Sequence, residues 1–235
     1  MKTETRHALK QDKFAQAAAS GASWLSDNKS SVARWTITIA VVVVLIVGGA
    51  ILWAVRTSAA DRELGAAMDV FGTALASPEA PDIAGVYKSA ADRAKAANTQ
   101  FVAIASKYSW LKQGKTAQYF AGITYQEMGQ TAQAETALKP AAGAWNRDLS
   151  NLAKIALAGI YHQSSRDGEA ETLYNQIVAK PSTTVTAAAA QLNLADLYVA
   201  QGKMDQARAL WAKVQDADKQ GAAGEIAAQK LQQSK

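Results

Sequence analysis

The sequence predicts an all-α protein: an N-terminal single transmembrane helix followed by an α-solenoid of about four degenerate helix pairs, closed by a C-terminal capping helix. Three observations support this fold class. Nineteen consecutive residues, Ile37 to Val55, carry no charge. After them, alanine is abundant and β-branched runs are nearly absent, as is typical of helical chains. A pattern of tyrosine, small residues and glycine then recurs about every 36 residues, which is typical of helical repeats.

The first element in chain order is a basic tail, residues 1–35. Residues 1–34 contain six Lys and Arg and three Asp and Glu, whereas only Arg56 and Arg62 carry positive charge between the apolar segment and Lys88. Positively charged flanks of a membrane helix tend to stay in the cytoplasm. We therefore expect the N-terminus in the cytoplasm and the C-terminal domain on the other side of the membrane.

The second element is the transmembrane helix, residues 36–56. Nineteen helical residues at ~1.5 Å each span about the ~30 Å hydrocarbon core of a bilayer. Trp35 and Trp53 lie near its two ends, where indole rings favour the membrane interface. A buried core helix is the alternative, but such a helix normally has a polar face, and this one offers only Thr38. A cleaved signal peptide is a second alternative, although its apolar core spans only ~7–15 residues after a short basic start.

The third element is a domain of helical repeats, residues 57–235. Segments 117–138, 153–174 and 190–211 align at five positions. The shared positions are a tyrosine (Tyr125, Tyr161, Tyr198), a small residue three places earlier (Gly122, Ala158, Ala195), a turn residue four places later (Gly129, Ser165, Gly202), an alanine nine places later (Ala134, Ala170, Ala207) and a large residue thirteen places later (Leu138, Tyr174, Trp211). This pattern resembles the tetratricopeptide repeat, in which small residues allow two helices to cross closely.

A degenerate first pair and a capping helix complete the domain. Residues 61–76 form the expected first helix, and Ala97 to Tyr108 lie on its partner. Residues 77–82, with two prolines, form the loop between them. Pro140 is expected to kink or end its helix near Leu138. Residues 221–235 are expected to form the helix that caps the last pair.

Composition excludes several classes of function. The chain has no cysteine, which excludes disulfides, thiol catalysis and thiolate metal sites. The net charge of +5 is concentrated in the tail, and the basic residues of the domain are dispersed, so we expect no nucleic-acid partner.

No pattern of catalytic or metal-ligating residues is evident. His162 has no second ligand three or four residues away, so we expect no metal, no cofactor and no enzymatic activity. Residues 221–224 (GAAG) indicate a helix boundary and not a phosphate-binding loop. The remaining alternative is an enzyme whose site has no recognisable motif.

Helical repeats of this kind usually bind protein segments along the face formed by the first helix of each pair. The register above predicts a protein-binding groove on that face, with ordinary packing between helices as the alternative role of its members. The predicted groove residues are Tyr119, Ile123, Gln126, Ile155, His162, Leu192, Asp196 and Val199.

The whole arrangement resembles the YfgM-type bacterial inner-membrane proteins, which are ancillary subunits of the Sec translocon. The phrases KQDKFAQAAASGASWLSDNKSS (residues 10–31) and SAADRELGAAMDVFGTALAS (residues 58–77) resemble the tail and the helix that follows the anchor. The resemblance implies an inner-membrane protein with its repeats in the periplasm that links protein export to periplasmic chaperones. Its implied partners are translocon subunits, a prolyl-isomerase-like chaperone and exported clients. A scaffold for a different envelope assembly, secretion or division complex remains the alternative.

Overall fold

The computed structural model of the chain describes residues 24, 29–81 and 83–234. The described residues form helices joined by loops and no strand, which confirms the all-α prediction. The chain divides into two compact units, Met1–Arg56 and Thr57–Lys235, and each is treated by itself. Most of the predicted tail, residues 1–35, lies outside the described residues.

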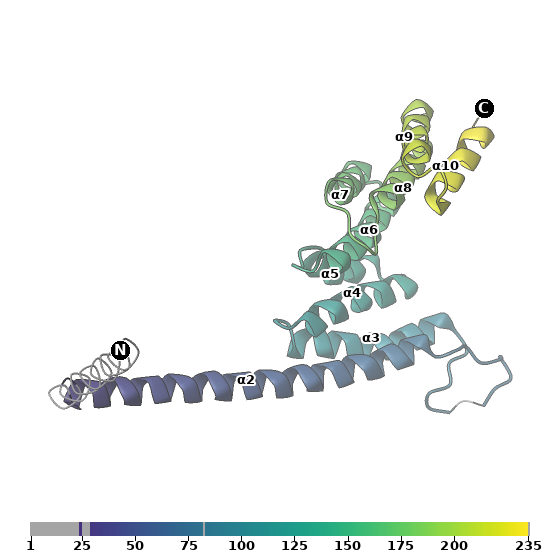
Figure 1. The fold of residues 1–235 in the computed structure, drawn as a ribbon. Helices are drawn as coiled ribbons and strands as arrows, with labels where there is room; N and C mark the ends of the chain where they lie inside the picture. The colour runs from purple at the N-terminus through teal and green to yellow at the C-terminus, as the bar shows by residue number, and fades with distance from the viewer. Residues whose placement is uncertain (1–23, 25–28, 82, 235) are drawn as a thin grey trace, which may run out of the picture. The chain divides into compact units, whose positions relative to one another are not determined.

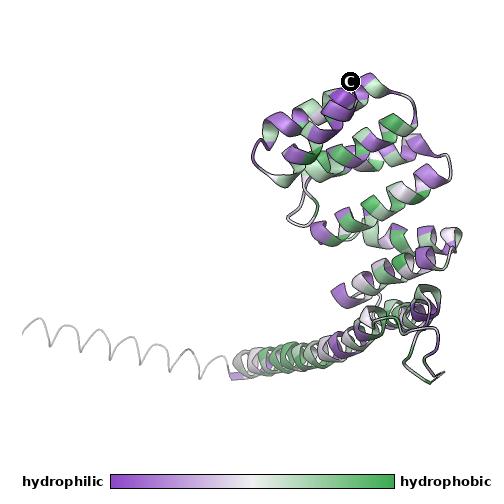
Figure 2. Cartoon of the chain, turned by 90° about the vertical axis from the view of Figure 1, so that its right-hand side faces the viewer, coloured by the Kyte–Doolittle hydropathy of each residue, from purple (hydrophilic) through white to green (hydrophobic). Residues whose placement is uncertain are grey.

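In the first unit, the described chain is the beginning of α2 (Lys29–Gly72). This helix is long and apolar enough, by length and composition, to cross a membrane, and none of its most apolar stretch is buried against protein. Val44 and Leu45 are each 69 % exposed. Figure 2 shows the hydrophobic colouring that runs around this part of α2. A helix that is apolar on all sides requires an apolar environment, either a protein core or lipid.

The second unit consists of four helix pairs stacked in chain order and a final helix (Figure 1). From α3 to α10 each helix packs on the next one along the chain, as in a solenoid, and the end of α2 shares a core cluster with α3. This arrangement confirms the predicted fold class. The pairs are the end of α2 with α3 (Ala90–Lys107), α4 (Lys112–Glu127) with α5 (Thr131–Ala142), α6 (Arg147–Gln163) with α7 (Asp167–Ala179), and α8 (Ala187–Ala200) with α9 (Met204–Ala217), followed by α10 (Ala222–Gln233).

The turns inside the three aligned pairs have the same backbone geometry. Gly129, Ser165 and Gly202 have φ angles of 71°, 58° and 73°, in the left-handed region that ends many helices. In each turn the residue that follows donates its backbone N–H to the carbonyl of the aligned tyrosine, at 2.7–2.8 Å. The turn position predicted from the alignment is therefore confirmed.

The small residues lie where the two helices of a pair cross. Gly122 is buried, and Ala158 and Ala195 are fully buried. A Cβ added to Gly122 would lie 2.4 Å from Cγ of Leu138, so the large side chain of α5 already occupies that space. The small residue and the large residue of the repeat pattern thus contact each other where the two helices cross.

Aromatic packing joins the two helices of the first pair to each other and to α4 of the second pair. The rings of Phe101 and Phe120 stack with centroids 5.3 Å apart, and Phe71 packs edge-on against Phe101 at 6.2 Å. Such pairs add stability beyond the burial of their area. The prediction that the first helix extends through residue 76 is wrong, because α2 ends at Gly72 and Leu75 lies exposed in the following loop.

One of the two outcomes expected for Pro140, an end of the helix near Leu138, is wrong. The helix does not end near Leu138, because α5 continues to Ala142 and includes the proline. Pro140 faces solvent, whereas Ala141 is fully buried and the carbonyl of Ala142 accepts a hydrogen bond from the Ser150 hydroxyl of α6. Packing of the last turn against α6 therefore outweighs the lost backbone hydrogen bond.

Candidate protein-binding surface

The alignment arranges the eight predicted groove residues in three rows of equivalent positions on α4, α6 and α8. Within a helix, positions separated by four and seven residues lie on one face. The alignment completes the middle row with Gly159, which was not among the predicted residues. The rows are Tyr119, Ile155 and Leu192; Ile123, Gly159 and Asp196; and Gln126, His162 and Val199.

The first row serves mainly to pack helices together. Tyr119 is half-buried against the central core and lies edge-on to Phe120, with ring centroids 5.1 Å apart. Burial raises the pKa of the Tyr119 hydroxyl above its ordinary value. Ile155 contacts two core clusters, and Leu192 packs against the cluster around Trp211. These residues contribute to stability, and each is only partly exposed.

The middle row is partly open. Ile123 is half-buried, and a Cβ added to Gly159 would meet no atom within 4 Å. Asp196 is exposed, and its carboxylate lies 2.7 Å from Nζ of Lys230 on α10. This ion pair links the last repeat to the capping helix, so the sequence register alone did not reveal the role of Asp196.

The third row is the most accessible. Val199 is 38 % exposed, and His162 lies exposed with its Nδ1 2.8 Å from Oδ1 of Asp167. His162 and Asp167 form a pair at the start of α7, as expected for a turn. Within residues 29–81 and 83–234, no cluster of three or more His, Asp or Glu has the arrangement of a metal site.

Charged groups in the domain stabilise contacts between successive repeats. Nη1 of Arg166 donates to Oε1 of Glu135 at 3.2 Å, and Nζ of Lys139 lies 2.8 Å from the same carboxylate. The hydrogen bond from Arg166 is the main reason why the pKa of Glu135 is lowered. One repeat later, the Tyr198 hydroxyl donates to Glu171 at 2.7 Å. Burial, assisted by this carboxylate, raises the pKa of Tyr198 to about 12.

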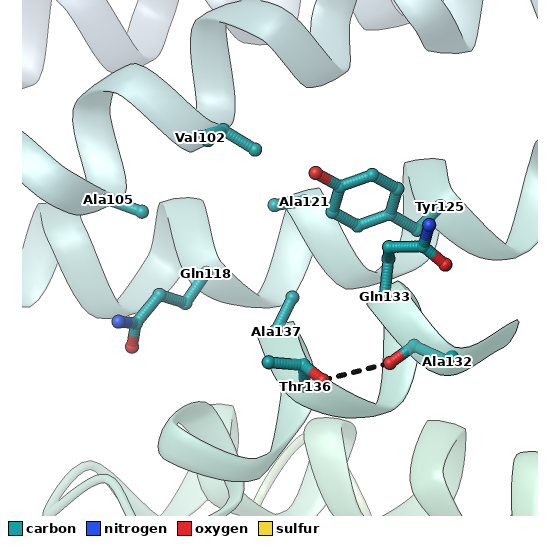
Figure 3. A pocket seen from close by; sticks show the side chains of 9 residues that line it. All are labelled: Val102, Ala105, Gln118, Ala121, Tyr125, Ala132, Gln133, Thr136 and Ala137. Carbon is teal, nitrogen blue, oxygen red and sulfur yellow. Dashed lines mark hydrogen bonds between the residues drawn. The ribbon is translucent and has the colours of Figure 1, made fainter. Parts of the chain in front are cut away.

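One hollow lies away from the predicted residues. It has a volume of about 390 Å³ and is formed by α3, α4 and α5 around Tyr125 (Figure 3). The register predicts only the face formed by the first helix of each pair, whereas this hollow is lined largely by the second helices α3 and α5. The available signal was Gln130, which stands where the later repeats have Arg166 and Lys203.

Comparison with known proteins agrees with this geometry. The model of the tetratricopeptide repeat-like domain family matches residues 23–234. Two crystal structures of nearly identical TPR-like repeats from a putative kinesin light chain of Podosopora anserina are similar in fold. The first has a TM-score of 0.52 at 17 % identity and covers 61 % of this chain and 77 % of its own. The second has a TM-score of 0.51 at 18 % identity, with coverages of 61 % and 78 %.

No curated protein sequence matches the chain significantly. The match to the family model extends over most of the chain, from the start of the apolar helix to the end of the capping helix. The repeat pattern, the stacked helix pairs and this match agree, and the chain belongs to the tetratricopeptide repeat-like domain family.

Proposed function

We propose that this protein is a membrane-anchored scaffold that binds protein segments and has no catalytic activity of its own. The observation that carries the proposal is a repeat domain, of a fold typically used for protein interaction, in the same chain as an apolar segment of membrane-spanning length. The face of α4, α6 and α8 supports it further. Ile123 and Val199 offer apolar surface there, with open space at Gly159.

The anchor is the helix of residues 36–56, and the repeats, residues 57–235, lie in the periplasm of a bacterial inner membrane. The charge asymmetry of the sequence supports this orientation. The absence of cysteine permits a direct test with Trp145→Cys, since Trp145 is 85 % exposed. A membrane-impermeant maleimide should label this single thiol in intact cells. Labelling that requires the cells to be broken open would contradict the orientation.

The specific task is that of an ancillary translocon subunit, which passes newly exported proteins to periplasmic chaperones. The resemblance of residues 10–31 and 58–77 to YfgM-type proteins supports this task. The expected partners are translocon subunits, an anchored prolyl-isomerase-like chaperone and exported clients. Binding requires neither metal nor cofactor in this proposal.

Co-purification tests the task. The full-length protein, with a C-terminal affinity tag, is extracted from bacterial membranes in mild detergent, and co-purifying proteins are quantified by mass spectrometry. The control is the tagged anchor alone, residues 1–60. Translocon subunits enriched only with the full chain would support the export role. Enrichment of one unrelated envelope complex would retain the scaffold and contradict the export role, and equal recovery with both baits would contradict partner binding by the repeats.

A further inference from the structure

The first hollow of the groove around Tyr125 has a neutral lining. α3 contributes Val102 and Ala105, α4 contributes Gln118, Ala121 and Tyr125, and α5 contributes the rest. The residues of α5 are Ala132, Gln133, Thr136 and Ala137. None of the nine is charged, although 19 % of the chain is. Figure 3 shows the Tyr125 ring lying over the hollow, with alanine methyl groups between the helices.

The later repeats close the corresponding place with a cation. In the alignment, Gln130, Arg166 and Lys203 each follow the aligned tyrosine by five residues. The guanidinium carbon of Arg166 lies 4.1 Å from the centroid of the Tyr161 ring, and Nζ of Lys203 lies 5.6 Å from that of Tyr198. Gln130 carries no charge, and in the described part of the chain no cation covers the Tyr125 ring. The tyrosine face that a cation covers in the third and fourth pairs therefore has no such cover in the second pair.

The later repeats also close this place with a carboxylate. Glu135 and Glu171 occupy one position of the second helix, and each bonds the following repeat, through Arg166 and Tyr198 respectively. The corresponding residue of α3 is Asn98. Its amide donates instead to the Ala121 carbonyl at 3.1 Å and to the Thr124 hydroxyl at 2.9 Å. Both groups that seal the later junctions are thus absent from the junction between α3 and α5.

The groove is elongated. A second hollow, of about 470 Å³, shares Tyr125 with the first, and its lining includes the charged residues Asp92 and Lys95. The uncharged part of the groove is therefore the first hollow. Ala91 and Ala105 mark the two ends of the lining along α3. Fourteen residues of helix rise by about 21 Å. An extended chain advances by ~3.3 Å per residue, so the groove has room for about six extended residues.

We propose that the groove formed by α3, α4 and α5 around Tyr125 binds an extended, mostly uncharged protein segment of about six residues, with one large apolar side chain in the hollow beside Val102. The amides of Gln118 and Gln133 match the hydrogen-bonding groups of a peptide backbone. The Thr136 hydroxyl donates to the Ala132 carbonyl at 2.9 Å (Figure 3), so it can only accept a hydrogen bond from a ligand. The uncharged, largely methyl floor favours an apolar side chain over a charged one, which would lose its hydration there.

This inference rests on the proposed function, because it assumes that the repeats bind protein. It adds a site that shares no residue with the predicted face of α4, α6 and α8. Unfolded chains expose extended segments with apolar residues. The groove would therefore bind clients that are unfolded and carry little charge in the bound segment.

The test measures peptide binding by fluorescence anisotropy, with the full-length protein in phospholipid nanodiscs. The probe is a capped, fluorescein-labelled octapeptide with the sequence Gly-Gln-Thr-Phe-Leu-Thr-Gln-Gly. The matched peptide replaces Phe-Leu by Ser-Ser. We expect saturable binding of the first and binding of the second weaker by about tenfold or more. Equal binding of the two, or no binding of either, would overturn the proposal.

Variants then locate the site. Val102→Glu and Ala132→Glu place a carboxylate in the groove at exposed positions, and Gln130→Arg restores the cation of the later repeats. Each should weaken binding by about tenfold. Ile226→Glu on α10 is the matched control, since Ile226 is 44 % exposed and lies outside both surfaces. Its affinity should equal that of the wild type, and circular dichroism melts should show all four variants folded.

A further substitution separates failure of the groove from failure of the proposed function. Val199→Glu alters the face of α8 by the same chemical change. Loss of binding with Val199→Glu together with retained binding in Val102→Glu would overturn the groove and support the face of α4, α6 and α8. Loss of peptide binding in Val102→Glu and Gln130→Arg, with binding retained in Val199→Glu, would support the groove.

Discussion

The substitution Gly122→Ala tests whether the helix crossing is packed as tightly as the structure indicates. The added Cβ would lie 2.4 Å from Cγ and 2.7 Å from Cδ2 of Leu138. These distances are far below the ~3.5–4.0 Å of favourable carbon contact. Leu138 is fully buried, so its side chain has no solvent into which it can move. The clash must therefore be relieved by a shift of α4 against α5.

The expected magnitude is the difference between two effects. Overpacking of a filled core costs about 1–3 kcal/mol. Replacing glycine by alanine inside a helix gains about 0.5–1 kcal/mol, because the unfolded chain loses conformational freedom. We expect a net loss of about 1–2 kcal/mol in the free energy of unfolding. For a domain of this size, that lowers Tm by about 2–8 °C.

Gly159→Ala is the matched control, because it makes the same chemical change inside α6 where the added Cβ meets nothing within 4 Å. Only the helix-forming effect remains, so Tm should rise by about 1–4 °C. The assay is thermal unfolding by far-ultraviolet circular dichroism, with the full-length proteins in one detergent. Stabilisation by both substitutions would refute the proposed close crossing at Gly122.

Three further predictions concern other contacts of the domain. Ala195→Trp inserts a large ring at a fully buried position beside the Trp211 cluster and should reduce stability by a few kcal/mol; an unchanged Tm would argue against the repeat register. Gly202→Ala places a side chain at φ 73° and should cost about 1 kcal/mol, measured by urea unfolding; no change in the midpoint would contradict the left-handed turn. The Asp148 carboxylate accepts the backbone N–H of Thr184 at 2.9 Å and the hydroxyl of Thr183 at 3.0 Å, which lowers the pKa of Asp148 to about 2. A lowered pKa contributes stability above the ordinary value of 3.8 that is lost as pH falls toward 2. Asp148→Asn should therefore reduce Tm at pH 7 and have little effect at pH 2, and an equal reduction at both values would contradict this role.

Local patterns that depend on close contact could be predicted from the sequence. The tyrosine, the small residue, the turn residue and the large residue recur because each is dictated by the crossing of two helices and the turn that joins them. Gly129, Ser165 and Gly202 accordingly share one backbone conformation, although only two of them are glycines. The predicted capping helix is likewise present as α10, Ala222–Gln233.

Features that depend on tertiary packing could not be predicted in this way. Pro140 breaks local propensity, yet Ala141 and Ala142 remain helical because α6 packs on them. Asp196 belongs to the predicted face by register, but its pairing with Lys230 depends on how α10 closes the last repeat. The groove around Tyr125 is open because Gln130 and Asn98 stand where the later repeats have a cation and a carboxylate. The roles of those two charged groups follow from their contacts in the structure and not from the sequence.

The central claim is that the repeats bind protein, and in-cell photo-crosslinking tests it most directly. A photoreactive amino acid replaces Ile123, His162 or Val199, one at a time, in the full-length chain, and crosslinked proteins are identified by mass spectrometry. The same amino acid at Ile226 on α10 provides the control. The account predicts specific crosslinks to envelope proteins or exported clients from the three positions and few from position 226. The same low yield from all four positions, or crosslinks only to other copies of the chain, would contradict it.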